Sequence, residues 1–240
     1  MLEAINLSKQ YDDGFCALHQ LNLTVANGEM LFLLGANGAG KTTTINLFLD
    51  FLRPTTGAAI IDGIEVARNP LDAKRLVAYL PESVALYHSL TAANNIQYFT
   101  GLAGVRRIDR RVLLDTLCRV GLAPADADRR VAVFSKGMRQ KLALAIALLT
   151  GVRNLVLDEP TSGLDPVSAR GLMHLLRELR DDGCAILLST HDVFRAADAA
   201  DQVVIMRGGK VTTRLTREDP SFSNLELLYL TIMGDTERLP

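Results

Sequence analysis

The fold of this 240-residue chain is indicated most strongly by one stretch, Gly35-Ala36-Asn37-Gly38-Ala39-Gly40-Lys41-Thr42. It fits the pattern G-x-x-x-x-G-K-[ST], in which the backbone N–H groups of a glycine-rich loop hold phosphate oxygens. The apolar run at 30–34 before it is typical of a strand buried on both faces, and a helix is predicted from about 41 to 52. Because the start of that helix adds positive partial charge, the stretch predicts a phosphate-binding site.

The loop residues have separate predicted roles. Lys41 is expected to reach the β- and γ-phosphates, and the Thr42 hydroxyl is expected to ligate Mg²⁺. The alternative is a chance glycine-rich turn, which occurs in on the order of one in a hundred chains of this composition. The strand before the loop and the helix after it favour the phosphate site. The residues predicted to bind nucleotide here are Gly35, Ala36, Asn37, Gly38, Ala39, Gly40, Lys41, Thr42 and Thr43.

The segments before the loop are predicted to be antiparallel strands. Apolar residues alternate with polar ones in 2–7 and in 21–25, and a turn-rich segment at 12–14 separates them. The segment 58–66 has Asp62-Gly63 at its middle and predicts a hairpin. We therefore predict an antiparallel β subdomain at the N-terminus.

The segments after the loop divide into two kinds. Between about 69 and 150 strand signals nearly vanish and helices dominate, whereas short apolar strands and helices alternate again from 155 onward. Such alternation predicts a parallel sheet. The predicted fold class is therefore α/β, with a RecA-like P-loop NTPase core in residues 1–210 and a helical lobe inserted at about 69–150. Residues 211–240 form a predicted C-terminal extension, with a helix at 225–233.

Composition excludes several classes of protein. With 48% hydrophobic and 22% charged residues, the chain has enough apolar surface to fold. Its net charge of −1 gives no general attraction for nucleic acid. Cys16, Cys118 and Cys184 show no metal-binding spacing and predict reduced thiols. The start of the chain lacks signal-peptide character, and the apolar run 142–149 is too short to span a bilayer.

A second motif, Leu155-Val156-Leu157-Asp158-Glu159, is a predicted buried strand ending in two carboxylates. The carboxyl edge of a parallel sheet is where ligands bind. Because adjacent strand residues point to opposite sides, we expect two different roles. Asp158 is expected to hold Mg²⁺, and Glu159 to orient or deprotonate the attacking water. The alternative is an ordinary charge pair at a strand end, which the phosphate loop makes the weaker interpretation.

With these motifs, residues 2–210 resemble the nucleotide-binding subunits of ABC transporters. Phe134-Ser135-Lys136-Gly137-Met138 resembles the family's LSGGQ signature, with Lys136 in place of a glycine and Met138 in place of glutamine. The resemblance implies two subunits arranged head to tail, with ATP between the phosphate loop of one and Ser135 and Gly137 of the other. The sequence SKGMRQ at 135–140 resembles the motif of the family branch that serves ABC-2-type exporters.

The resemblance also implies roles for four single residues. Tyr11 would stack on adenine, although a tyrosine near a turn is more often packing. Glu82, in Tyr79-Leu80-Pro81-Glu82, stands where the family has the Q-loop glutamine and would contact Mg²⁺; the alternative is a solvated acid. Asp165 of the D-loop would lie at the dimer interface, and it can equally cap a helix before Pro166. His191 would contact the γ-phosphate.

The apolar segment 84–90 has two open interpretations, a core element of the lobe or a surface that receives a helix from the membrane subunit.

The leading hypothesis for function is an ATPase that powers an ABC transporter, predicted to be an exporter, through ATP-driven dimer closure. ATP and Mg²⁺ are the predicted cofactors. The predicted partners are an integral membrane subunit and a second ATPase subunit, either identical or paralogous, at the cytoplasmic face of the membrane. The alternative is a soluble ABC ATPase acting on nucleic acid or ribosomes, for which the net charge is unfavourable. A small-molecule kinase is a third interpretation, and it leaves Ser135 and His191 unexplained.

Overall fold

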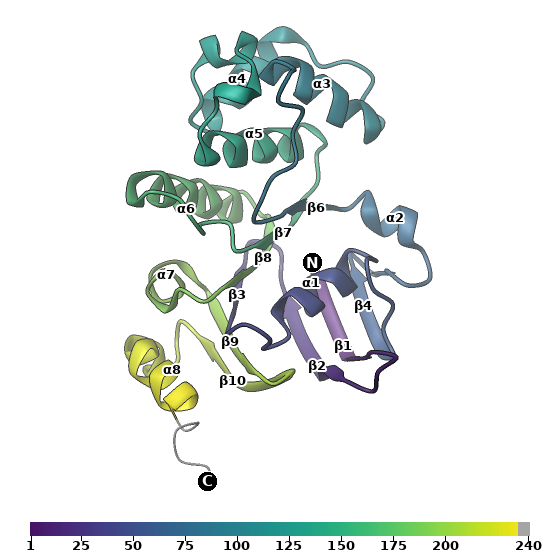
Figure 1. Cartoon of the computed structure of the whole chain (residues 1–240), viewed down its shortest axis with the longest axis vertical. Coiled ribbons are helices and arrows are strands. Elements are labelled where there is room, and N and C mark those ends of the chain that lie inside the picture. Colours follow the sequence, from purple (N-terminus) through teal and green to yellow (C-terminus); the bar gives the residue numbers. More distant parts are fainter. Residues whose placement is uncertain (235–240) are drawn as a thin grey trace.

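The computed structural model of the chain describes residues 1–234 and contains two sheets and a helical lobe (Figure 1). The smaller sheet is antiparallel, with the order β2-β1-β4-β5. The larger sheet has the order β10-β9-β3-β8-β7-β6, and all its neighbouring strands are parallel except β9 and β10. The predicted α/β class, with a parallel core and an antiparallel N-terminal subdomain, is confirmed.

The elements have the following bounds. The strands are β1 (Leu2–Gln10), β2 (Cys16–Val25), β3 (Met30–Leu34), β4 (Thr56–Ile61), β5 (Ile64–Glu65), β6 (Val77–Leu80), β7 (Asn154–Asp158), β8 (Ala185–Thr190), β9 (Gln202–Arg207) and β10 (Lys210–Thr216). The α-helices are α1 (Lys41–Phe48), α2 (Pro70–Lys74), α3 (Ala92–Leu102), α4 (Arg110–Arg119), α5 (Lys136–Leu149), α6 (Pro166–Asp181), α7 (Val193–Ala199) and α8 (Leu225–Gly234). Short 3-10 helices cover Pro124–Asp128, Val131–Val133 and Pro220–Asn224.

Strand β3 lies at the centre of the molecule, and all five of its side chains are fully buried. Met30, Phe32 and Leu34 pack into the core on the side of the lobe, whereas Leu31 and Leu33 pack against the antiparallel sheet and α1. Complete burial of one such side chain stabilises the fold by about 1.5–3 kcal/mol. The loop that follows β3 is therefore anchored from both faces of the sheet.

Strand β6 and the end of helix α1 differ from the expectation. Strand β6 lies inside 69–150, pairs in parallel with β7 and forms the edge of the larger sheet. Its short, half-buried sequence carries little strand signal. Helix α1 ends at Phe48 instead of Leu52, because Asp50 has a left-handed backbone with φ 56°.

The C-terminal part of the chain begins within the sheet. Strand β10 pairs with β9, and α8 then packs on α7, in agreement with the predicted helix at 225–233. Residues 235–240 of the predicted 211–240 extension lie outside the described residues. Within residues 1–234, no helix is long and apolar enough to cross a membrane.

The lobe contains α3, α4 and α5, which lie at one end of the molecule in Figure 1. Thr91 caps α3, since its hydroxyl accepts a hydrogen bond from the Asn94 N–H at 3.2 Å. Helix α5 packs on α3 and α4 within the lobe and also on α6 and β6. It is therefore the element that joins the lobe to the core.

Candidate functional site

The glycine-rich loop runs from the end of β3 into α1, and its backbone requires glycine. A Cβ atom on Gly35 would lie 2.5 Å from the Met206 carbonyl oxygen, which is too close for any side chain. Gly38 and Gly40 have φ of 79° and 105°, conformations that other residues rarely adopt. The loop thus curls as a phosphate cradle needs, and the glycine spacing of the motif follows from contacts in this chain.

Lys41 is the buried charge of the loop, with 6% of its surface exposed. Its ammonium donates to the Gly35 carbonyl at 2.6 Å and to the Ala36 carbonyl at 3.3 Å. Burial lowers the pKa of Lys41, and the negative charges of Glu159 and Asp158 oppose that shift. A buried ammonium held at the mouth of a loop is positioned to bind an anion.

An aromatic pair borders the same loop. Tyr11 and Phe15 stack with ring centroids 6.4 Å apart, and both line a pocket of about 240 Å³ together with residues 36–43. The structure therefore places Tyr11 beside the phosphate loop, where a planar base can stack on it. Phe15 was not predicted, because its only sequence signal is its proximity to Tyr11.

Asp158 and Thr42 meet across the site, although they are far apart in sequence. The Thr42 hydroxyl donates to an Asp158 carboxylate oxygen at 3.4 Å, and the other carboxylate oxygen accepts from the Ser189 hydroxyl. Hydroxyl and carboxylate oxygens are ligands that Mg²⁺ prefers. Within residues 1–234, no group of three or more His, Cys, Asp and Glu side chains is arranged to hold a metal. This donor set fits an ion that takes its other ligands from water and phosphate.

Glu159 lies between an ammonium group and an imidazole ring. Its carboxylate is 4.0 Å from the Lys41 ammonium and 3.0 Å from Nδ1 of His191. Only 16% of its side chain is exposed, compared with 63% for His191. The expectation that Asp158 and Glu159 point to opposite sides of a strand was wrong, because β7 ends at Asp158 and Glu159 has φ 45°. Both carboxylates face the phosphate loop.

Ser189, on β8, holds the two carboxylate residues in place. Its hydroxyl donates to Asp158 and accepts from the Glu159 N–H at 3.1 Å, and its carbonyl accepts from the same N–H at 3.2 Å. Sequence reasoning missed it. The available signal was its position two residues before His191, at the carboxyl end of a buried strand.

Glu82 is exposed, and its carboxylate accepts a hydrogen bond from the Ser162 hydroxyl at 2.7 Å. It therefore contacts the D-loop segment, and its predicted contact with Mg²⁺ stays a prediction.

Ser135, Gly137 and Asp165 lie at the starts of two other helices. The Ser135 hydroxyl caps α5 by accepting from the Met138 N–H at 3.2 Å, and it is exposed. Gly137 is buried, and a Cβ there would lie 3.2 Å from Cβ of Ser168. Asp165 caps α6 by accepting from the N–H groups of Val167 and Ser168, which confirms the capping interpretation. Their contacts with nucleotide or partner remain predictions.

Similarity to known proteins agrees with this geometry. Residues 18–162 match the family described as "ABC transporter". The chain is 33% identical over 229 residues to the lantibiotic transport ATP-binding protein SrtF of Streptococcus pyogenes, covering 95% of this chain and 96% of SrtF. It is similar to a solved ATP-binding subunit of an ABC transporter, with a TM-score of 0.85, 32% identity and coverage of 97% and 99%. It is also similar to a dimeric ATP-binding cassette bound to ADP and Pi, with a TM-score of 0.80, 25% identity and coverage of 91% and 100%.

Proposed function

The chain belongs to the family of ABC transporter ATP-binding subunits, and we propose that it hydrolyses ATP with Mg²⁺ at a site shared between two cassettes. The observation that carries the proposal is the convergence of Lys41, Glu159 and His191 at the loop between β3 and α1. Lys41 begins α1, whereas Glu159 and His191 directly follow β7 and β8. As an ATPase of this family, the subunit powers a transporter.

Each residue of this cluster has a defined task in the proposed reaction. The loop N–H groups and the Lys41 ammonium bind the β- and γ-phosphates and stabilise the negative charge of the transition state. Glu159 accepts a hydrogen bond from the attacking water and takes its proton. His191 donates from Nδ1 to the Glu159 carboxylate, and in its doubly protonated form Nε2 would also donate toward the γ-phosphate. Tyr11, with Phe15, stacks on the adenine ring.

Thr42 and Asp158 are the residues that would hold Mg²⁺. When bound, the ion neutralises charge on the phosphate oxygens. Ser189 fixes the Asp158 carboxylate, so that its orientation is set before the ion arrives.

The position of the signature helix supports a site shared between two subunits. Ser135 is exposed at the start of α5, and α5 packs on α3, α4, α6 and β6, whereas the phosphate loop leads into α1. The two anion-binding helix starts thus belong to different parts of one subunit. A second copy, or a paralogous cassette, placed head to tail supplies its Ser135 to the first copy's phosphate loop. The similarity to a dimeric cassette bound to ADP and Pi supports this arrangement.

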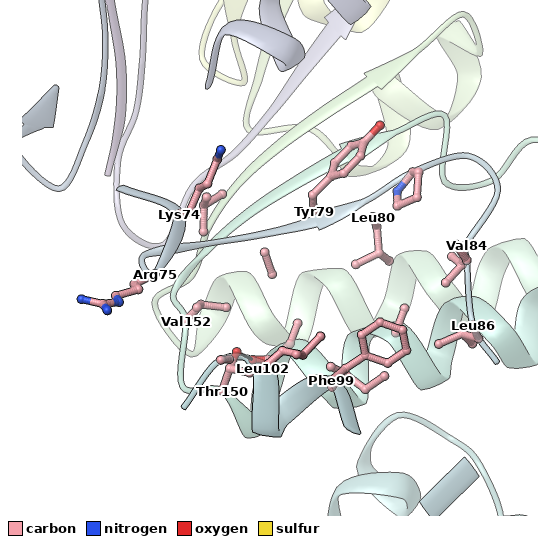
Figure 2. Close-up of a pocket in the computed structure, with 18 of the residues that line it drawn as sticks. Lys74, Arg75, Tyr79, Leu80, Val84, Leu86, Phe99, Leu102, Thr150 and Val152 are labelled. Carbon is pink, nitrogen blue, oxygen red and sulfur yellow. Dashed lines mark hydrogen bonds between the residues drawn. The ribbon is translucent and has the colours of Figure 1, made fainter. Parts of the chain in front are cut away.

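A membrane-embedded partner is proposed to dock between the lobe and the core. Figure 2 shows the cavity of about 590 Å³ there, with Leu80, Val84, Leu86 and Phe99 among its lining residues and Lys74 and Arg75 at one end. Leu71 and Leu102, which also line it, are 74% and 69% exposed. An apolar groove with a basic end fits an amphipathic helix that carries a carboxylate. In segment 84–90, Leu86 packs on the core while Tyr87 is 46% exposed, so both interpretations hold in part.

The direction of transport is proposed to be export. The support is the resemblance of Tyr79-Leu80-Pro81-Glu82 and Ser135-Lys136-Gly137-Met138 to the ABC-2-type exporter branch. The cargo is selected by the membrane partner.

The test is a Glu159→Gln variant, tagged and recovered from detergent-solubilised membranes in the presence of Mg²⁺ and ATP. Turnover is expected to fall at least about 100-fold, with ATP still bound. A polytopic membrane protein is expected to co-purify, and Leu102→Glu is expected to release it without loss of ATPase activity. Glu218→Gln, an exposed change after β10, is the control. Unchanged turnover in Glu159→Gln would remove its catalytic role, and recovery of only soluble proteins or RNA would remove the transporter partner.

A further inference from the structure

Gln140 is a buried polar residue of helix α5 that the proposed chemistry does not use. It is 1% exposed, and its side-chain Nε2 donates a hydrogen bond to the Pro160 carbonyl. The orientation of the amide is fixed by this partner, because a carbonyl can only accept. Its Oε1 is buried and has no hydrogen-bond partner among residues 1–234. An unpaired buried oxygen destabilises a fold. The presence of glutamine at this position is therefore explained by the hydrogen bond that its Nε2 donates.

The carbonyl that Gln140 binds follows directly after a strained residue. Glu159 has φ 45°, a conformation uncommon outside glycine, and it precedes a proline, which normally favours extended backbone. Such conformations persist only where the surroundings hold them. On one side, Ser189 accepts two hydrogen bonds from the Glu159 N–H, at 3.1 Å and 3.2 Å. On the other side, Gln140 holds the next peptide group.

The rest of this helix start also rests on the segment after Glu159. A Cβ on Gly137 would lie 3.2 Å from Cβ of Ser168, and one on Gly163 would lie 3.3 Å from the Lys136 ammonium. Residues 136, 137 and 140 therefore face the segment 160–168 together. Lys136, which replaces the glycine of the family signature, contributes to this contact. The Ser135 end of α5 and the backbone that carries Glu159 form one packed unit.

We infer that Gln140 is a positioning residue, which fixes the Glu159 carboxylate by holding the Pro160 carbonyl against the signature helix. The inference rests on the proposed function, because it assumes that Glu159 acts on the attacking water. If a nucleotide contacts the start of α5, a displacement of that helix would move the Pro160 carbonyl through Gln140, and with it the Glu159 of the same subunit. A residue that only filled space would stabilise the fold without affecting the rate of hydrolysis per folded molecule.

The deciding variant is Gln140→Met, which keeps the length of the side chain and removes both the donor and the unpaired oxygen. Because the lost hydrogen bond is offset by the removal of the unpaired oxygen, the Tm is expected to stay within about 4 °C of wild type. The kcat for ATP hydrolysis is expected to fall at least about tenfold, since a misplaced base is ineffective. The KM for ATP is expected to change less than about threefold, because the phosphate loop is untouched.

Leu144→Ala is the matched control. Leu144 lies one turn further along α5, is fully buried and makes no side-chain hydrogen bond. This change is expected to lower the Tm and leave the kcat of the folded protein unchanged. Gln140→Glu is the conservative rescue, because a buried carboxyl group favours its neutral form and can then donate to Pro160. At about pH 6 it is expected to recover most of the wild-type kcat measured at the same pH.

A normal kcat in folded Gln140→Met, or a raised KM with normal kcat, would overturn the inference. So would a kcat that falls equally in Leu144→Ala. If Gln140→Met does not fold, Gln140→Glu decides, and a folded, tenfold slower enzyme at about pH 6 would count against the positioning role. The Glu159→Gln result separates the two proposals. If Glu159→Gln is inactive and Gln140→Met is normal, only this inference fails; if Glu159→Gln is active, the proposed function itself loses its base.

Discussion

Helices α1 and α5 both begin where a phosphate is proposed to bind, but their first turns are completed in different ways. Helix α1 starts after Gly40, which has φ 105° and offers no side chain to cap the helix. Helix α5 starts after Ser135, whose hydroxyl accepts from the Met138 N–H. Neither helix has an acidic residue in its first turn. The start of α1 therefore has no side-chain cap and is open to an external anion, whereas the start of α5 is capped by its own Ser135.

With these two helix starts, one chain can present two unequal halves of the proposed site. The first four N–H groups of a helix need acceptors, and an anion or a cap can supply them. A glycine start with a buried lysine gives the stronger half-site, with Lys41 6% exposed and close to Glu159. Ser135 is exposed, and we propose that it forms the half-site used by a second subunit.

The largest expected effect removes the charge at α1. Lys41→Ala is expected to lower kcat/KM for ATP at least about 100-fold, because a preorganised cation at the phosphates is lost. Steady-state phosphate release measures it. Lys210→Ala, which removes an exposed lysine on β10, is the control and is expected to match wild type. Similar losses in both variants would contradict the special role of the α1 start.

The next effect concerns the backbone of the same start. Gly40→Ala is expected to weaken ATP binding about tenfold or more and to destabilise the fold by about 1–3 kcal/mol, because its φ is positive and the new Cβ would meet the Ala17 carbonyl at 3.0 Å. Gly171→Ala, at an open position within α6, is expected to stabilise by up to about 1 kcal/mol. Thermal unfolding and nucleotide titration check the pair. Equal behaviour of the two glycines would show that the α1 start is not conformationally constrained.

Removal of the cap on α5 is expected to have a smaller effect, and it separates the capping role of Ser135 from its role in turnover. Ser135→Ala is expected to destabilise the fold by about 1 kcal/mol and to slow ATP turnover several-fold. Thr91→Ala removes the equivalent cap of α3, so it is expected to cost similar stability and leave turnover unchanged. Chemical unfolding and ATPase assays of both variants measure the two effects. Turnover that falls equally in both would mean that Ser135 acts only as a cap.

The smallest effect lies at a third helix start, where a charge caps α6. The Ser168 hydroxyl and N–H keep the pKa of Asp165 below its ordinary value. A lowered pKa means that the carboxylate contributes stability at neutral pH and that this contribution is lost as the pH falls through the lowered value. Asp165→Asn is therefore expected to be slightly less stable than wild type at neutral pH, with a difference that shrinks in acid. Urea unfolding at several pH values tests the sign, and a difference that grows in acid would contradict it.

The sequence is most informative where a site is contiguous. Strand β3 was predicted from one apolar run, and the loop at 35–42 was predicted from the glycine pattern that follows it. Strand β6 was not predicted, since its four residues acquire strand character only by pairing with β7. The predicted orientation of Glu159 was wrong, because the left-handed backbone of Glu159 itself ends the alternation of side chains along the strand. Ser189 and Gln140 contact residues 158–160 from 20 to 31 positions away, and no local pattern encodes such contacts.

We propose that ATP joins the α1 start of one subunit to the α5 start of another. The most direct measurement is the mass of Glu159→Gln in solution, by sedimentation or light scattering, with and without Mg²⁺ and ATP. We expect the mass of the 26.1 kDa chain without ATP, about twice that mass with ATP, and no such increase when Ser135→Arg is added. A chain that binds ATP at unchanged mass, or that doubles equally well with Ser135→Arg, would contradict it.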